Sequence, residues 1–176
     1  AEPLPAFGRL DARGRPSGAL RHWSDELTRM VEAMLENPAH GLPARSADSV
    51  RLGVARLLAS LRGGEAVPAS LVHGDLSPGN IIVTAGVADP ASGPGLSGLV
   101  DWEMARSADA ALDLASLRFE WRGALAPLAR RAEQAYRAAR VAAGGEACLA
   151  DWERRVALAT VPRLLDARAV ARRRVA

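Results

Sequence analysis

The sequence lacks lysine altogether and has one cysteine and no long apolar run. All 23 basic residues are arginines, so every role that needs a fixed positive charge falls to arginine. Cys148 is the only cysteine, which excludes a disulfide within the chain and favours the cytoplasm; a small core residue is its expected role. No apolar run approaches the roughly 18 residues of a membrane span, and residues 1–5 lack the basic and apolar regions of a signal peptide.

The charge balance does not predict a nucleic-acid partner. The pI is 10.3, but the net charge is only +3, because the arginines are interspersed with 20 acidic residues. The one dense cluster, residues 172–174, carries no interleaved aromatic side chains. We therefore expect solvated helix faces, with neither nucleic acid nor a membrane as partner.

Hydrophobic periodicity predicts a single α+β domain that is mainly helical. Apolar residues at three- and four-residue steps predict helices over residues 17–37, 47–61, 110–121, 124–143 and 146–173. Ser46 is the expected cap of the second helix, Gly63-Gly64 its end, and Pro162 a possible break in the last. Residues 1–16 carry Pro and Gly at short intervals and are expected to be extended.

Short apolar runs rich in β-branched residues predict strands at residues 70–73, 81–84 and 99–100. The Gly- and Pro-rich residues 85–97 are the expected connection of a hairpin. Two helices are thus expected before the first strand.

The informative segment runs from Leu71 to Val83 and reads Leu-Val-His-Gly-Asp-Leu-Ser-Pro-Gly-Asn-Ile-Ile-Val. Asp75 and Asn80 hold the spacing of a kinase catalytic loop, and Asp101 ends a later strand, as the metal-binding aspartate of kinases does. Either motif alone is matched by an ordinary turn or helix cap. Both in order, each at the end of a predicted strand, favour a catalytic function.

Phosphoryl transfer explains why these residue types are needed. It requires a carboxylate that orients the attacking hydroxyl and accepts its proton, which Asp75 can supply, and metal to neutralise the phosphate oxygens. Mg²⁺ prefers oxygen ligands, and Asn80 and Asp101 can provide one amide and one carboxylate. His73 would anchor the loop rather than react.

The sequences His-Gly-Asp-Leu-Ser-Pro-Gly-Asn and Val-Asp-Trp-Glu resemble those of the aminoglycoside phosphotransferase and choline kinase-like family. The resemblance implies a protein-kinase-like C-terminal lobe, ATP or another nucleoside triphosphate with Mg²⁺, and a small-molecule hydroxyl acceptor. It places Asp75 and His73 in the catalytic loop, and Asn80, Asp101 and Ser77 on the nucleotide side, with Asn80 and Asp101 as metal ligands.

Two further positions are assigned by the same resemblance. Gly74 stands where protein kinases place an arginine that pairs with a phosphorylated loop, so control of that kind is not expected. Residues 108–115 resemble the family stretch Gly-Asp-Pro-x-x-Asp-Leu-Ala but depart from it at Ala108 and Ala110. The retained Asp113 would brace the catalytic loop through hydrogen bonds.

Two kinase features are missing. There is no lysine to hold the α- and β-phosphates, and no Gly-rich hairpin precedes Asp75; residues 93–100 match that hairpin's letters but follow the catalytic loop. In the family these features belong to an N-terminal lobe. We therefore expect a C-terminal lobe alone, with a helical part at 1–69, a catalytic β segment at 70–104 and an acceptor-side helical part at 105–176. The ATP-clamping lobe would act in cis or in trans, and the isolated chain should turn over little.

The C-terminal helices form the acceptor pocket in the resembling family. The candidate acceptor residues are Glu120, Trp121, Asp151, Trp152 and Glu153. Acidic helix residues are more often solvated, and tryptophans more often core. Two other functions remain open: a non-catalytic, pseudokinase-like interaction module, and a metal-dependent phosphoesterase that uses His73, Asp75 and Asp101.

Overall fold

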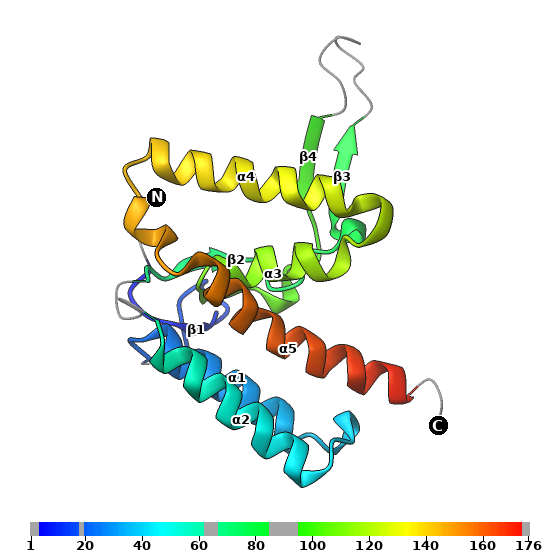
Figure 1. The fold of residues 1–176 in the computed structure, drawn as a ribbon. Coiled ribbons are helices and arrows are strands. Elements are labelled where there is room, and N and C mark those ends of the chain that lie inside the picture. Colours follow the sequence, from blue (N-terminus) through cyan, green and yellow to red (C-terminus); the bar gives the residue numbers. More distant parts are fainter. Residues whose placement is uncertain (1–3, 18–19, 62–66, 85–94, 174–176) are drawn as a thin grey trace.

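The computed structural model describes residues 4–17, 20–61, 67–84 and 95–173 (Figure 1). The α-helices are α1 (Trp23–Glu36), α2 (Ala44–Ala59), α3 (Ala111–Glu120), α4 (Ala126–Ala142) and α5 (Trp152–Arg173). The strands are β1 (Gly8–Arg9), β2 (Ser70–Val72), β3 (Ile81–Thr84), β4 (Gly95–Leu99) and β5 (Arg106–Ala108). Short 3₁₀ turns connect them: η1 (Pro38–His40), η3 (Pro78–Asn80), η5 (Trp102–Met104), η6 (Gly123–Leu125) and η7 (Glu146–Leu149). The described chain is mainly helical with small antiparallel sheets, as predicted.

Helix α5 crosses the middle of the molecule, with α3 on one side and the paired α1 and α2 on the other (Figure 1). Leu158 and Ala159 of α5 are fully buried in this core. The apolar residues of α1 recur at helical spacing, and Leu27 and Val31 face the same core. Pro162 lies inside α5 without ending it, because buried residues before and after it hold the helix in place.

A three-stranded antiparallel sheet has the order β1-β5-β2, in which Leu71 and Gly8 both lie opposite Ser107. Neither β1 nor β5 was predicted, so the expectation of two helices before the first strand is wrong. Their sequences, Gly-Arg and Arg-Ser-Ala, have low strand propensity, and pairing within the sheet decides their conformation. The N-terminal segment is thereby tied to the sheet that holds the catalytic loop.

Strands β3 and β4 form a separate hairpin that projects from the body of the molecule (Figure 1). Ile81 pairs with Leu99, and the register shifts between Ile82 and Val83. β4 begins at Gly95, earlier than the predicted residues 99–100, because β3 supplies hydrogen-bond partners for a Gly-rich segment of low strand propensity. Most of the predicted connection, residues 85–94, lies outside the described residues.

Helix boundaries differ from the predictions where backbone bonds compete. α1 begins at Trp23 rather than at residue 17, since the carbonyl of Leu20 accepts a bond from the N–H of Phe7. α2 begins directly after Pro43, so Ser46 lies inside the helix and is not its cap. Gly63-Gly64, the predicted end signal, lies outside the described residues. None of the described helices is both long and apolar enough to cross a membrane.

Candidate active site

The predicted catalytic loop, residues 73–80, connects β2 to β3 and is held by a carboxylate from α3. The backbone N–H groups of His73 and Gly74 donate to the Oδ2 and Oδ1 atoms of Asp113, at 2.8 and 2.9 Å. Burial raises the pKa of Asp113 above its ordinary value, against the opposing effect of these two bonds. Asp113 therefore braces the start of the loop from the first turn of α3.

His73 is 1% exposed, and both of its ring nitrogens have partners within the protein. Its Nε2 lies 2.8 Å from the carbonyl oxygen of Val100, and its Nδ1 accepts a bond from the N–H of Asp75 at 3.3 Å. A proton on Nε2 satisfies both contacts. The imidazole thus joins the catalytic loop to the end of β4, and its ring lies 4.7 Å from that of Trp102, measured between centroids.

Gly74 is required by the local backbone. Its φ of 79° lies in the left-handed region, and a Cβ at this position would overlap the carbonyl oxygen of Met104. The arginine that protein kinases carry here would not fit between the loop and η5.

Asp75 is held by an arginine that the sequence did not single out. Nη1 of Arg163 lies 3.0 Å from Oδ1 of Asp75, Nη2 donates to the carbonyl of Gly74, and Nε donates to Oγ of Ser116 at 2.9 Å. Arg163 belongs to α5, 88 residues along the chain from Asp75. Nothing in the local sequence separates it from the other arginines of that helix, so only the tertiary structure reveals it.

Asn80 and Asp101 lie at the same end of the β3–β4 hairpin. Asn80 accepts a backbone bond of 3.0 Å from the N–H of Val100, which places Asp101 next to it. The Nδ2 atom of Asn80 donates to the carbonyl of Asp75 at 2.9 Å and approaches its Oδ2 at 3.4 Å. The amide nitrogen of Asn80 is thus used within the loop, and its amide oxygen is the atom able to act as a cation ligand.

The backbone of Asp101 adopts the left-handed conformation, with φ 64° and ψ 60°. Such conformations are uncommon outside glycine and cluster at functional sites. The residue is exposed. Ser77 is half-buried; its N–H donates to the carbonyl of Asp75 at 2.8 Å, whereas its hydroxyl makes no capping bond to η3. The structure thus brings Asp75, Asn80 and Asp101 together, with Ser77 in the same loop.

Comparison of the sequence with models of protein families identifies the family of this chain. The model described as the phosphotransferase enzyme family matches residues 4–171, which is nearly the whole chain. The chain belongs to this family. The match confirms the resemblance to aminoglycoside phosphotransferases. Searches of curated proteins and of solved structures gave no match.

Asp109 is a second buried carboxylate of this phosphotransferase-family chain that sequence reasoning left without a role. It is 0% exposed, and its Oδ1 accepts the N–H of Ala111 at 3.0 Å at the start of α3. Arg155 of α5 donates to both of its oxygens, at 2.7 and 2.6 Å. Asp109 occupies the first Asp of the family stretch that residues 108–115 resemble, so the sequence could have indicated it. No sequence pattern indicated that Arg155 is its partner.

Two of the five predicted acceptor residues are engaged in contacts with other helices. Glu153 pairs with Arg118 at 2.8 Å, and Trp152 is buried, with its Nε1 donating to Glu133. The other three are Glu120 at the last position of α3, Trp121 at its C-cap and Asp151 directly before α5. None of the five is among the residues that line the cavities described below next to Gly74 and Arg163. Their role as acceptor contacts stays a prediction.

Proposed function

We propose that this chain carries the phosphoryl-transfer centre of an ATP-dependent small-molecule kinase with a protein-kinase-like C-terminal lobe. The observation that supports it best is the convergence of Asp75, Asn80 and Asp101 at one end of the β3–β4 hairpin. Asp75 would orient the acceptor hydroxyl and accept its proton, while Arg163 and Asp113 hold the loop still. Ser77 would face the nucleotide from the same loop.

Asn80 and Asp101 suit a Mg²⁺ ion because they offer one amide and one carboxylate oxygen, and phosphate oxygens and water complete six ligands. Mg²⁺ would neutralise the charge that develops on the phosphate oxygens. Among the described residues there is no group of three or more His, Cys, Asp or Glu side chains that could hold a metal by themselves. The phosphoesterase hypothesis required more such ligands and finds no support here.

The rest of the nucleotide site would come from a second unit, in cis or in trans, that covers the hairpin. The exposed apolar side chains of this region support that proposal; they are Ile82, Val83, Leu96, Val100 and Trp102. With no lysine in the sequence, the contacts that such a residue makes to the phosphates must be provided elsewhere. We expect weak nucleotide affinity and little turnover from these 176 residues alone.

Paramagnetic Mn²⁺ tests the metal site without requiring turnover. Added with ATP to the ¹⁵N-labelled chain, it should broaden the amide signals of Asn80 and Asp101 first, and Asp101→Asn should weaken this effect by about tenfold or more. Glu103→Gln, an exposed acidic position two residues away, is the matched control and should change nothing. Broadening that persists in Asp101→Asn, or that centres elsewhere, would remove the basis of the proposed function.

A further inference from the structure

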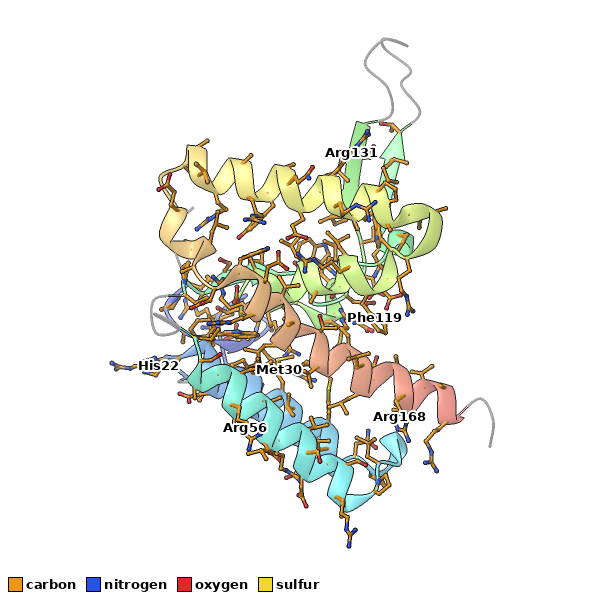
Figure 2. The ribbon with its side chains drawn as sticks, in the orientation of Figure 1. His22, Met30, Arg56, Phe119, Arg131 and Arg168 are labelled. Carbon is orange, nitrogen blue, oxygen red and sulfur yellow. The ribbon has the colours of Figure 1, made fainter. Side chains whose placement is uncertain are left out.

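Two adjoining cavities lie on the side of the catalytic loop that faces α1 and α5. The smaller, about 90 Å³, touches Gly74 and Arg163 of the candidate active site. The larger, about 230 Å³, shares five lining residues with it: Met30, Met34, Met104, Arg106 and Asp166. Figure 2 shows Met30 in this region of the molecule. All three methionines of the chain line both cavities, which gives them adaptable apolar walls.

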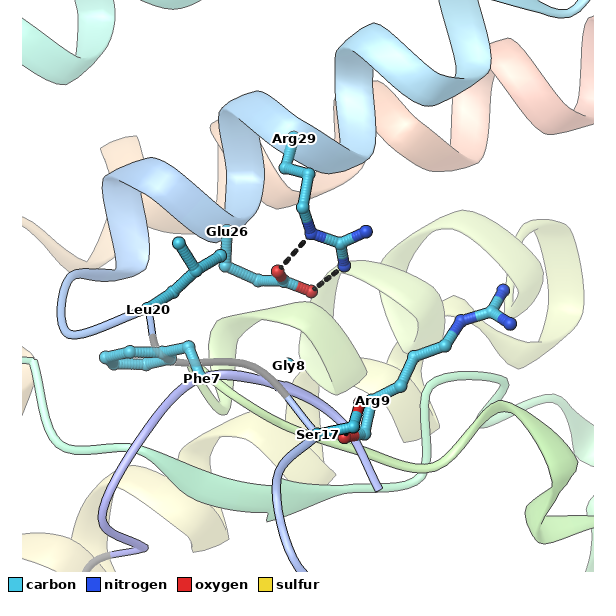
Figure 3. Close-up of a pocket in the computed structure, with 7 residues that line it drawn as sticks. All are labelled: Phe7, Gly8, Arg9, Ser17, Leu20, Glu26 and Arg29. Atoms are coloured by element: carbon cyan, nitrogen blue, oxygen red, sulfur yellow. Dashed lines mark hydrogen bonds and ion pairs between the residues drawn. The ribbon is translucent and has the colours of Figure 1, made fainter. Parts of the chain in front are cut away.

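Arginines dominate the charged lining. Arg9, Arg29 and Arg106 line the larger cavity, where Asp166 is the one acidic lining residue among those described. A third cavity of about 370 Å³ continues past Arg9 and Arg29. Figure 3 shows it with apolar Phe7 and Leu20 at one end and the Arg9 and Arg29 side chains at the other. We call the joined 90 and 230 Å³ cavities, with Arg9, Arg29, Arg106 and Arg163, the arginine pocket.

Arg9, Arg29 and Arg106 have fewer carboxylate partners than charges. Glu26, which is 0% exposed, is shared between Arg29 at 2.8 Å and Arg106 at 3.4 Å. Within the described part of the chain, no carboxylate pairs with Arg9. Among the described residues, the carboxylates that pair with the four arginines or line the pocket beside them are Glu26, Asp75 and Asp166, so one net positive charge remains in the arginine pocket.

Arg106 carries a buried donor without an acceptor. Its side chain is 7% exposed, and its Nε atom is buried with no hydrogen-bond partner among the described residues. Burial lowers the pKa of Arg106 from its ordinary value; Glu26 opposes this, while Arg9, Arg29 and Arg163 lower it further. An unpaired buried donor of this kind is unfavourable, and an acceptor oxygen of a bound anion would satisfy it.

We propose that the arginine pocket binds the carboxylate or phosphate group of a small anionic alcohol and presents its hydroxyl to Asp75. This inference rests on the proposed function and specifies its acceptor class. Gly74 and Arg163 both line the smaller cavity. Gly74 precedes Asp75 in the chain, and Arg163 is bonded to the Asp75 carboxylate, so an acceptor in the pocket would lie next to Asp75. The alcohol oxygen bonds to the γ-phosphorus of ATP as its proton passes to Asp75. The bond from that phosphorus to the bridging oxygen breaks, and its electron pair leaves with ADP.

The test uses the 176-residue chain without nucleotide and four matched three-carbon alcohols: glycerol 3-phosphate, glycerate, glycerol and 2-amino-1,3-propanediol. Titration calorimetry or NMR should show binding of the two anions, weakening as salt is added, and at least about tenfold weaker binding of the neutral and cationic alcohols. Equal binding of all four, or tighter binding of the cation, would overturn the proposal.

Variants locate the binding. Arg106→Gln and the exposed Arg9→Gln should each weaken binding of glycerol 3-phosphate by about tenfold. Arg9 is on the surface, so its variant remains informative if Arg106→Gln fails to fold. Arg56→Gln, an exposed arginine of α2 labelled in Figure 2, is the matched control and should leave binding unchanged. Loss of binding in the Arg56 variant alone would overturn the assignment.

Adding Mg·ATP tests whether the arginines bind the anionic group of the acceptor or the phosphates of the nucleotide. If the arginines instead hold nucleotide phosphates, Mg·ATP will displace glycerol 3-phosphate, which would overturn the acceptor assignment; simultaneous binding supports it. Nucleotide binding that depends on Asp101, without any anion binding in the pocket, would sink this inference and keep the proposed function. Anion binding together with Mn²⁺ broadening that persists in Asp101→Asn would sink the proposed function and the acceptor role with it.

Discussion

Two buried arginines, Arg155 and Arg106, occupy regions of opposite character. Arg155 has a 4% exposed side chain and meets both oxygens of Asp109 together with the carbonyls of Cys148 and Ala150. Arg106 is buried almost as fully, but within the described residues its side chain makes one bond, of 3.4 Å to Glu26, and its Nε has no partner. This chain has no lysine, so arginines serve both structural and ligand-binding roles. An arginine whose N–H donors all have acceptors in the protein stabilises the fold, whereas one with an unpaired donor can bind a ligand.

The largest effect is expected from breaking the saturated pair. Arg155→Met would leave the Asp109 carboxylate buried with little compensation and should lower the free energy of unfolding by roughly 3–5 kcal/mol. Urea unfolding followed by circular dichroism measures this. Arg154→Met is the neighbouring control: its side chain is half exposed, and its ion pair should contribute at most about 1 kcal/mol. Equal losses in both variants would show that burial of Arg155 confers no special role.

Arg106→Met should lower the free energy of unfolding by a smaller amount, about 1–3 kcal/mol in the same assay. The loss is smaller because Glu26 keeps its two bonds of 2.8 Å to Arg29. The variant also removes an unpaired donor. A loss as large as that of Arg155→Met would mean that Arg106 holds the fold, and the contrast between the two regions would disappear.

The same contrast explains what could be predicted from the sequence. Asp75, Asn80, Asp101 and Asp113 stand at fixed spacings in short motifs, because a loop between two strands imposes its geometry locally. The elements β3, α3 and α4 were predicted to within about two residues for the same reason, since their periodicity is carried by their own side chains.

What escaped prediction depends on tertiary contacts. The strand β1 forms by pairing with β5, and β5 pairs with both β1 and β2; Arg163 reaches Asp75 across 88 residues of sequence. The acceptor side was assigned to acidic residues by resemblance, whereas most of the charged residues that line the cavities beside the loop are arginines, which come from β1, α1, β5 and α5. Neither periodicity nor motif spacing reports which arginines of a helix face inward.

Arg163 differs from both Arg155 and Arg106, because its donors are satisfied by Asp75 and Gly74 of the catalytic loop and by Ser116 of α3. Arg163→Met should raise amide hydrogen exchange of residues 74–77 by about tenfold or more, because a charged hydrogen bond contributes roughly 1.5–3 kcal/mol. Arg163→Lys should restore part of the protection through Asp75 alone. Exchange in α4 is the internal control and should not change. Unaltered protection of the loop in Arg163→Met would show that Asp113 alone positions Asp75.

The smallest effect is expected at a surface arginine whose pairs are half-buried. Burial raises the pKa of Glu133, but hydrogen bonds from Arg118 and Trp152 outweigh it and hold that pKa below its ordinary value of 4.5. Because the unfolded chain then takes up the proton more readily as the pH falls, this stabilisation is complete above pH 4.5 and is lost as the pH drops through the lowered pKa.

Arg118→Gln should therefore reduce stability at pH 7 by about 1 kcal/mol, a figure kept small because the Arg118 side chain is 37% exposed. It should also flatten the acid limb of the stability curve, measured by thermal unfolding between about pH 3 and pH 7. Arg51→Gln is the matched control, since its pairs with Glu32 and Asp48 are more exposed, and it should leave that limb unchanged. If both variants flatten the acid limb equally, net charge rather than the Glu133 contact governs stability in acid. Complete pairing of the N–H donors would then affect stability only for arginines as buried as Arg155.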